Sequence, residues 1–461
     1  MRIIRELKEY PPLFEIFSLV HDREEAVFLD SSLQNEMGCF SIVGLYPYLK
    51  LVKGEKFTVN GEPCEESFEE YVSAYLRQNR EDNPTKLPLV AGALGYFSYD
   101  YGREKEEIHT RHSGQIRMPL CQLCFYDAFL IEDHREQSLS LIANGKKRDA
   151  GQIMEELLDL VERTRKDMQK RAPLFPSNPE RKKADFRADF SGNAYRKAVQ
   201  NMIDYIIEGD IYIVNMTQQL HIPTKANPYE VFLRLRKENP SPFGVYLNTR
   251  EFQIVCASPE RFLRIRNGQV ETRPIKGTRK RGQTPEEDEQ LRLELLHSEK
   301  DRSELLMIVD LERNDLNRVC RPGSVRVTEL FTVETYATVF HLVANVVGEL
   351  QDDRTAMDVI QAVFPGGSIT GAPKLRAMEL IDEQERGRRG LYTGSIGYLS
   401  LDGTCDLNIV IRTGVFQEGI CHLGVGGGIT FESDLTFEYE ETLQKAKAIL
   451  EALYEEKVYP V

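Results

Sequence analysis

The sequence predicts an α+β protein with mostly antiparallel strands, built from two parts of the chain. Short strand-like segments such as AVFLDSS, SIVGLYPYLKLV and LVAGALGYFSYD occupy much of the first 170 residues. Residues 171–187, RAPLFPSNPERKKADFR, concentrate proline and charge, which is typical of a linker. Helix-like and strand-like segments alternate after it. We therefore expect an N-terminal domain at 1–170, a linker at 171–187 and a second domain at 188–461.

Three segments carry clear local signals. GQIMEELLDLVERTRKDMQKR is a helical run just before the linker. In AYRKAVQNMIDYIIEG, Ala198, Met202, Tyr205 and Ile206 recur on one side and a glycine ends the run, which predicts an amphipathic helix. FQIVCASPERFLRIRNGQVETRP predicts two strands joined through an Asn-Gly turn.

Composition excludes several classes of partner. The chain has 461 residues, enough for a large core, and its 59 Lys and Arg against 73 Asp and Glu give a net charge of −14. Nucleic acids and anionic membranes would repel such a protein, so neither is expected as a partner. The N-terminal segment is charged throughout, and no stretch approaches the roughly 20 apolar residues of a membrane span. We expect a cytoplasmic protein.

The eight cysteines are scattered through the chain, which suits reduced thiols better than a disulfide framework. Only Cys121 and Cys124 form a CxxC pair, within the apolar run PLCQLCFYDAFLI. Residues three apart in an extended strand point to opposite faces, and no second CxxC or histidine pair completes a zinc site. We interpret the pair as core packing.

Three acidic residues are candidate metal ligands. Glu438 and Glu441 stand three apart on a predicted helix, so both can reach one divalent cation. The alternative to a metal site is that both carboxylates are solvated in the first turn of the helix, where they complement the helix dipole. For this pair taken alone, the alternative is favoured. Glu304 lies beside the apolar side of the helix in EKDRSELLMIVDLERNDLNR, where a salt bridge at the rim is the commoner role.

Two glycine-rich segments and one lysine are candidate binding and nucleophilic groups. HLGVGGGITFES runs into a strand or turn, which excludes a dinucleotide-binding loop and leaves an anion site or a tight hairpin. FPGGSITGAPKLRAMELIDE predicts a helix N-terminus after a loop, suited to a carboxylate or simply an ordinary capped helix. Lys276 in ETRPIKGTRKRG can act as a nucleophile if its surroundings favour the neutral amine. The alternative is that Lys276 belongs to a basic surface loop.

These pieces form one ordered set of motifs. They are PIKGTRKRG, KDRSELLMIVDLERNDL, TVFHLVANVVGEL, FPGGSITGAPKLRAMELID, GSIGYLSLDG, LNIVIRTGVF, GVGGGIT and FEYEETLQKAKAIL. The set resembles the chorismate-binding domain shared by anthranilate synthase component I, aminodeoxychorismate synthase component I, and the isochorismate and salicylate synthases. The resemblance is strong from about residue 188 to 452 and weaker in FLDSSLQNEMGCFSIVG. It implies an N-terminal anthranilate synthase-like domain, a chorismate-binding catalytic domain, and a two-layer α/β sandwich of large antiparallel sheets with helices outside.

The resemblance also assigns residues to the site. Three carboxylates are expected to hold Mg²⁺, a cation that prefers oxygen ligands and often shares its shell with the substrate. Backbone N–H groups of a glycine loop, a tyrosine and two cations are expected to bind chorismate, while a histidine and a general acid stand near the leaving hydroxyl. The expected metal ligands are Glu304, Glu438 and Glu441. The expected chorismate-binding residues are Gly426, Gly427, Gly428, Tyr398, Arg412 and Lys445. The histidine is His341, and the general acid is Glu260.

Two positions distinguish reactions within the family. Lys276 stands where anthranilate synthases usually have alanine, and it resembles the nucleophile of the aminodeoxychorismate synthases. This implies amination of chorismate at carbon 4 through a covalent lysine intermediate, giving 4-amino-4-deoxychorismate for p-aminobenzoate and folate biosynthesis. The alternative is anthranilate synthase component I of tryptophan biosynthesis. Ile213 replaces the lysine that activates water in isochorismate and salicylate synthases, which disfavours those reactions.

The resemblance further implies two partners besides chorismate. No cysteine lies in the G-x-C-x-G setting of a glutaminase nucleophile, so ammonia is expected from a separate glutamine amidotransferase subunit. Ser31, Pro242 and Phe243 match positions that hold tryptophan in relatives, with simple packing as an equal alternative. A non-catalytic sensor is disfavoured, because all three acidic metal positions are present.

Overall fold

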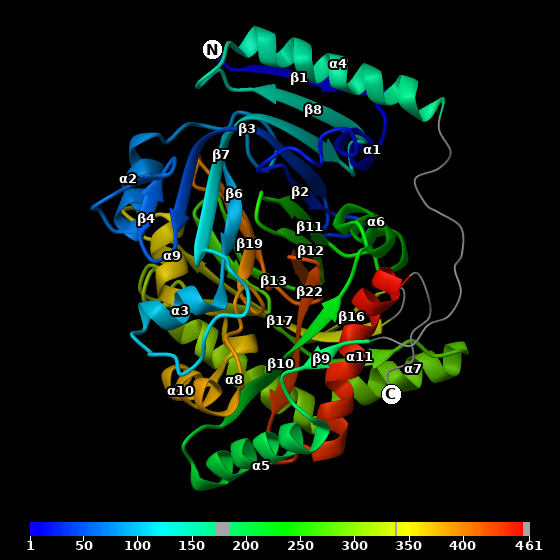
Figure 1. Ribbon diagram of the computed structural model, residues 1–461. Helices are drawn as coiled ribbons and strands as arrows, with labels where there is room; N and C mark the ends of the chain where they lie inside the picture. Colours follow the sequence, from blue (N-terminus) through cyan, green and yellow to red (C-terminus); the bar gives the residue numbers. More distant parts are fainter. Residues whose placement is uncertain (171–184, 337–338, 455–461) are drawn as a thin grey trace.

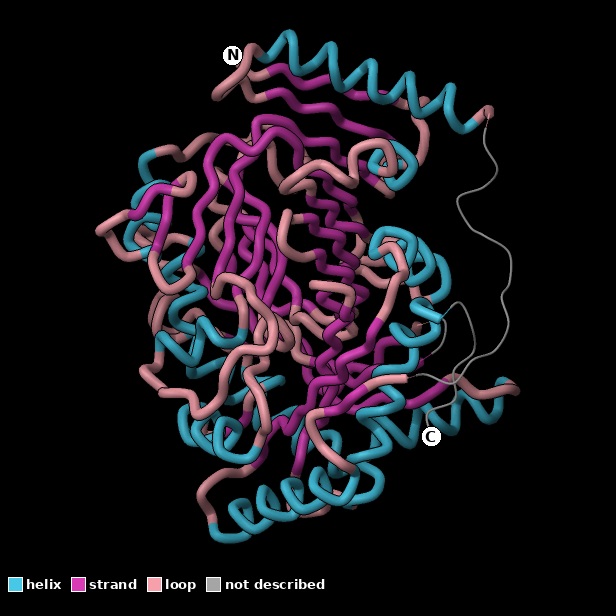
Figure 2. Tube along the Cα trace, viewed as in Figure 1, coloured by secondary structure: helices cyan, strands magenta, loops and turns pink. Residues whose placement is uncertain are grey.

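Antiparallel pairing organises the whole chain. The computed structural model describes residues 1–170, 185–336 and 339–454. Their strands form one hydrogen-bonded 22-stranded network in which every pairing is antiparallel. Strands gather in the middle of the molecule and helices lie around the outside (Figures 1 and 2). The predicted sandwich of large antiparallel sheets with helices outside is confirmed.

The strands before residue 171 are β1 (Ile3–Leu7), β2 (Val27–Asp30), β3 (Phe40–Lys53), β4 (Phe57–Val59), β5 (Glu62–Pro63), β6 (Gly92–Phe97), β7 (Cys121–Asp133) and β8 (Ser138–Ala143). The next are β9 (Arg187–Ala188), β10 (Ile213–Pro223), β11 (Phe243–Asn248), β12 (Gln253–Ser258), β13 (Arg261–Arg266), β14 (Gln269–Thr272) and β15 (Ile275–Lys280). The last are β16 (Arg326–Thr335), β17 (Val339–Glu349), β18 (Gly371–Ala372), β19 (Ser395–Ser400), β20 (Cys405–Asn408), β21 (Thr413–Gln417) and β22 (Ile420–Ile429).

The helices cover this network. They are α1 (Leu13–Phe17), α2 (Phe68–Gln78), α3 (Tyr99–Lys105), α4 (Ala150–Met168), α5 (Gly192–Glu208), α6 (Pro228–Glu238), α7 (Pro285–His297), α8 (Glu299–Leu316), α9 (Ala356–Val363), the short 3₁₀ helix η1 (Gly367–Ile369), α10 (Lys374–Gln384) and α11 (Leu435–Tyr454). In the part of the chain that the structure describes, none is long and apolar enough to cross a membrane.

The core has layers that follow the strand period of two. One cluster lies between strands from both parts of the chain, with Leu94 and Tyr96 of β6 facing Val245 of β11. On the other face of β6, Ala93 and Phe97 pack toward helices α2, α8 and α9. The sheets therefore pack on each other on one side and on helices on the other.

The CxxC pair is confirmed as core packing. Cys121 belongs to the cluster under the helices, whereas Cys124 belongs to the cluster between strands. Both thiols are buried, and no group of three or more His, Cys, Asp or Glu side chains among the described residues is placed to hold a metal ion.

The two parts of the chain are hydrogen bonded to each other. β2 pairs with β11, and β6 pairs with β19. Residues 171–184 of the predicted linker lie outside the described residues, and β9 begins at Arg187. The division into domains at 1–170 and 188–461 stays a prediction.

Local predictions are mostly confirmed. The two predicted helices are α4 and α5, and Gly209 ends α5 with a φ of 89°. The Asn-Gly turn joins β13 to β14 through two residues of positive φ, as a type I′ turn requires. The segment forms three strands rather than two, because Ser258-Pro259 interrupts it and separates β12 from β13.

A glycine bulge shapes the strand that carries Lys276. The register between β15 and β17 shifts between Lys276 and Thr278, and Gly277 has a φ of 71°. A Cβ on Gly277 would lie 2.8 Å from Asp301 and from Leu295. Only glycine therefore fits both the backbone conformation and the space.

Gly277→Ala should lower the urea midpoint and reduce the free energy of unfolding by about 2–5 kcal/mol, combining left-handed strain with overpacking. Gly268→Ala is the matched control, because Gly268 has a φ of 73° but no heavy atom within 4 Å of its Cβ position. It should show only the backbone cost of about 1–2 kcal/mol. Equal losses in the two variants would contradict the steric account.

Candidate active site

Lys276 and Glu260 are joined through Ser368. The Lys276 Nζ donates to the Ser368 carbonyl oxygen at 2.9 Å, and the Ser368 hydroxyl donates to Glu260 Oε1 at 2.9 Å. Lys276 lies on β15, Ser368 lies in η1, and Glu260 lies in the connection between β12 and β13. Three segments distant in sequence thus place the predicted nucleophile and the predicted acid around one serine.

Glu260 is suited to carry a proton. Its side chain is buried, and burial raises the pKa of its carboxyl group above the ordinary value. The Ser368 hydroxyl, the Lys276 charge and the Ile275 backbone N–H oppose that rise. A carboxyl group held between these effects can be protonated before the reaction and ionised after it.

Arg412 acts electrostatically on both Glu260 and His341. Arg412 has a φ of 50°, an unusual conformation for a non-glycine residue, and Glu260 acts electrostatically on its guanidinium. Burial lowers the pKa of His341 to about 4, and the Arg412 charge adds to this effect. His341 is therefore neutral at pH 7, with Nδ1 2.9 Å from the Thr278 hydroxyl.

The predicted glycine loop is the open end of a strand. β22 runs through residues 426–428 and pairs there with β10, but its pairing with β21 ends at Leu423. Among the described residues, no other strand pairs with the glycine stretch. Backbone N–H groups on this free edge are available to an anion, and the missing side chains allow close approach. Lys445 Nζ donates to the Gly426 carbonyl at 2.8 Å beside it.

The acidic residues of α11 face Gly427. A Cβ on this glycine would lie 2.4 Å from Glu441 Oε2 and 3.2 Å from Glu438 Oε2. Glu441 forms an ion pair with Lys445 at 2.7 Å. Burial raises the pKa of Glu438, the nearby Glu441 charge raises it further, and Ser433 opposes the rise.

The neighbouring glycine faces a different set of side chains. A Cβ on Gly428 would lie 3.6 Å from Lys276 Nζ, 3.7 Å from Glu304 Oε2 and 3.8 Å from Ile213 Cδ1. Burial raises the pKa of Glu304, Lys276 opposes the rise, and Glu441 adds to it. Gly427 and Gly428 thus bring the lysine, the three carboxylates and Ile213 into one region.

The three carboxylates fit a hard divalent cation by their chemistry. They supply only oxygen ligands, they converge on two glycines that leave space, and their mutual repulsion would be offset by a cation. In the side-chain positions described, they do not form a closed three-ligand cluster. Magnesium there stays a prediction.

A buried ion pair supports this region. Arg389 forms hydrogen bonds with Glu385 at 2.7 Å and 3.0 Å, and donates to the carbonyls of Ile369 at 2.8 Å and Asn215 at 2.6 Å. Glu385 also accepts from the backbone and hydroxyl of Thr217. Arg389 thereby fixes β10 relative to the η1 turn next to Ser368.

The predicted tryptophan residues meet elsewhere, with Tyr398. The Ser31 hydroxyl donates to the Pro242 carbonyl at 2.9 Å, and a cavity of about 70 Å³ is lined by Ser31, Pro242, Phe243 and Tyr398 among others. In the described part of the chain, no hydrogen bond or ion pair joins Tyr398 to Lys276, Glu260 or the glycine strand. The contact of Tyr398 with the substrate stays a prediction. Tryptophan binding here stays a prediction.

Sequence reasoning overlooked Tyr392 and gave Ser368 no specific role. The Tyr392 ring covers Gly424 of β22, so that a Cβ there would lie 2.1 Å from the ring, and the Glu441 charge acts on its hydroxyl. Tyr392 and Tyr398 stand six apart in LYTGSIGYL. Both are in the same motif, so sequence alone gave no means of choosing between them.

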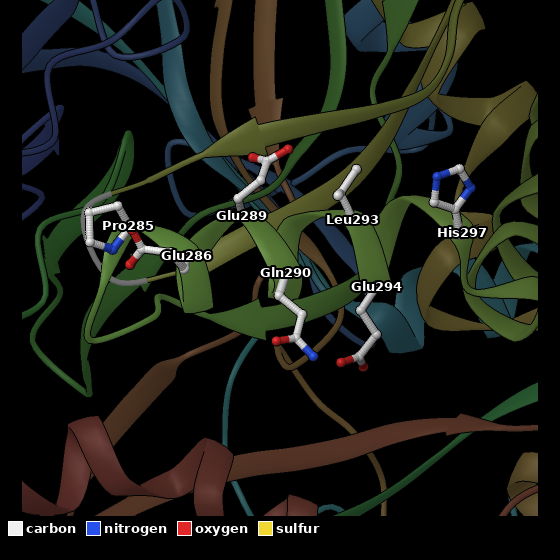
Figure 3. A pocket seen from close by; sticks show the side chains of 7 residues that line it. All are labelled: Pro285, Glu286, Glu289, Gln290, Leu293, Glu294 and His297. Atoms are coloured by element: carbon white, nitrogen blue, oxygen red, sulfur yellow. The ribbon is translucent and has the colours of Figure 1, made fainter.

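A second, open hollow lies on α7, and none of the site residues described above lines it. It measures about 800 Å³ and is lined by side chains of this one helix, in rows of residues four apart (Figure 3). Glu289 and Glu294 there are already paired with Arg292 and Arg279. A hollow over one exposed helix does not enclose a substrate.

The fold and the site together define an enzyme class. A partly buried lysine–serine–glutamate connection, a bare glycine strand edge and an acidic set suited to a hard cation are the groups needed for chemistry on a small anionic substrate.

Comparisons with known proteins identify the family. Residues 25–451 match the family described as chorismate binding enzyme. The chain is 39% identical over 443 residues to aminodeoxychorismate synthase component 1 of Bacillus subtilis, covering 94% of this chain and 93% of that protein. It is 37% identical to anthranilate synthase component 1 of Acetivibrio thermocellus, covering 90% and 87%. The crystal structure of anthranilate synthase component I from Streptococcus pneumoniae matches with a TM-score of 0.80 at 30% identity, covering 91% and 93%.

The chain therefore belongs to the chorismate-binding enzymes, and it is a chorismate-utilising enzyme.

Ser368→Ala should move the alkaline limb of the kcat/KM profile for chorismate to higher pH. The Ser368 hydroxyl lowers the pKa of Glu260, so its loss raises that pKa and keeps the acid protonated further into the alkaline range. The bond from Lys276 is made to the backbone carbonyl and remains. Ser368→Thr keeps a hydroxyl and should keep the original limb. An unchanged limb in the alanine variant would rule out this role.

Proposed function

We propose that the enzyme aminates chorismate at carbon 4 to give 4-amino-4-deoxychorismate. The observation that carries this proposal is the placement of Lys276, whose Nζ lies beside Gly428 and contacts the Ser368 turn that also holds Glu260. The relative from Bacillus subtilis bears the name of this activity and supports the same choice.

The proposed chemistry has two displacements. The Lys276 amine forms a bond to ring carbon 2, both conjugated ring double bonds shift, and the carbon 4–oxygen bond breaks with a proton from Glu260, so that water leaves. Ammonia then forms a bond to carbon 4, both double bonds shift back, and the carbon 2–nitrogen bond breaks to return Lys276. The proton that the Lys276 amine releases after its attack restores Glu260. The proton that ammonia releases after its attack restores the lysine amine. Chorismate and ammonia thus give the amino product and water.

Binding of the substrate would use the groups along the strand edge. The two carboxylates of chorismate suit the cations Arg412 and Lys445 and the N–H groups of Gly426 and Gly428, which point to the free edge. The Gly427 N–H instead faces Met216 in the pairing with β10. His341 is neutral at pH 7 and would lie near the departing hydroxyl. Ile213 beside Lys276 provides an apolar wall that offers no base to activate water.

The ammonia would come from a separate glutamine amidotransferase subunit, and we place the reaction in the cytoplasm. Free ammonium at alkaline pH should replace that subunit in vitro. The second candidate is anthranilate synthase component I, which the relative from Acetivibrio thermocellus supports by name. Under that alternative Lys276 has no covalent role.

Purified enzyme given chorismate, magnesium and ammonium should yield p-aminobenzoate only when an aminodeoxychorismate lyase is added. Lys276→Ala removes the nucleophile, and we expect at least about a thousandfold loss of the amino product, in the range found for removal of a covalent catalyst. Lys280→Ala is a matched control on the same strand, since Lys280 is exposed. Anthranilate formed without the lyase, or full activity of Lys276→Ala, would overturn the proposal.

We also propose that Glu304, Glu438 and Glu441 hold Mg²⁺, which when bound would polarise a substrate carboxylate. Glu438→Gln should raise the magnesium concentration for half-maximal activity at least about tenfold, since one charged ligand is lost. Glu440→Gln is the control, because Glu440 lies on the same helix but is exposed. Activity that survives EDTA would exclude a metal.

A further inference from the structure

One polar atom inside the site has no partner. The side-chain oxygen Oδ1 of Asn215 is buried, and no hydrogen-bond partner for it exists among the described residues. Buried side-chain oxygens in folded proteins are nearly always paired, and an exception within a binding site points to a ligand. The sequence motifs assigned no role to this residue.

Asn215 faces the same region as Lys276. It is directly opposite Gly428 in the β10–β22 pairing, and directly opposed residues share a face of the sheet. Ile213, two residues earlier on β10, also lies on that face, with Cδ1 3.8 Å from the Cβ position of Gly428. Lys276 Nζ and Glu304 Oε2 lie at almost the same distance from that position.

The backbone of Asn215 is fixed on both sides. Its N–H donates to the Thr370 carbonyl at 2.8 Å, and its carbonyl accepts from Arg389 Nη2 at 2.6 Å. Arg389 is itself buried and paired with Glu385. The side-chain amide is therefore presented to the site from a rigid strand, which is how a binding group is kept in place.

The chemistry of an unpaired oxygen selects the ligand. The carboxylate and ether oxygens of chorismate only accept hydrogen bonds, and its hydroxyl on carbon 4, which is a donor, has left as water before ammonia attacks in the proposed sequence. Ammonia has three N–H donors and one lone pair, and the lone pair must point at the carbon that it attacks. The Lys276 nitrogen is bonded to carbon 2 when ammonia attacks in the proposed sequence, it already donates to Ser368, and Ile213 offers no polar atom.

We propose that Asn215 Oδ1 accepts an N–H of the attacking ammonia and orients its lone pair toward the substrate. This inference rests on the proposed use of ammonia, and it names a contact for the nucleophile rather than for chorismate. Ile213 lies on the same strand face and excludes water from the contact between Asn215 and ammonia.

The test is the KM for ammonium at alkaline pH, measured with saturating chorismate. Asn215→Leu should raise the ammonium KM at least about tenfold, the effect of losing one hydrogen bond to a ligand. The chorismate KM should stay within about twofold, because no contact with chorismate is removed. Asn215→Asp keeps an acceptor oxygen but replaces the amide donor with a negative charge, so its ammonium KM should rise less than that of Asn215→Leu.

Gln219→Leu is the matched structural control. Gln219 lies on the same face of β10 with a buried, unpaired Oε1, but it is opposite Gly424 and donates to the carbonyls of Arg388 and Arg389. The Gln219→Leu variant should have a lower free energy of unfolding and an unchanged ammonium KM.

Three results would overturn the inference. They are an unchanged ammonium KM in Asn215→Leu, a rise of the chorismate KM instead, and an equal rise of the ammonium KM in Gln219→Leu.

Failure of the proposed function can be distinguished from failure of this inference. If the wild type makes anthranilate, the product is reassigned while the ammonium KM still tests Asn215. If it makes no amino product at all, both proposals fall.

Discussion

The buried pair of Arg389 and Glu385 is the interaction on which the site depends. Both side chains are almost fully buried, and the guanidinium joins the η1 turn to β10 while the carboxylate holds Thr217. Removing one partner of a buried ion pair typically costs about 3–5 kcal/mol, because the other charge is left without compensation. In this protein that loss would also free the turn carrying Ser368 and the strand carrying Asn215. One ion pair thus sets the relative position of the groups around Lys276.

The site also concentrates charges that do not balance locally. Glu304, Glu438 and Glu441 act on one another inside a partly buried region, and burial already raises the pKa of the first two. The protein has a net charge of −14, and the nearby cations Lys276 and Lys445, which lie beside Gly428 and Gly427, oppose this charge locally. Backbone N–H groups on the free edge of β22 add a further attraction that needs no side chain.

Much of the fold was accessible from local pattern. Strand-like segments and the proline-rich break predicted mostly antiparallel strands in two parts of the chain, and the helices carrying Glu304 and Glu438 were confirmed as α8 and α11. The sequence did not show that Tyr392 and Tyr398, which share a motif, lie in different places: the Tyr392 ring covers Gly424, whereas Tyr398 lines the cavity beside Ser31 and Pro242. Pro259 is visible in the sequence. The sequence did not show that Pro259 separates two strands and places Glu260 between them.

The sequence by itself determined the family, the order of the motifs and the residue types that bear the chemistry, because these are properties of adjacent residues. Only the tertiary structure decided which of them meet. Lys276 reaches Ser368 across 92 positions, and Ser368 reaches Glu260 across 108. The role inferred for Asn215 depends on its register against Gly428 and on an unpaired oxygen, neither of which local periodicity encodes. Contacts between distant segments arise from packing and strand register, and these are fixed only when the whole chain folds.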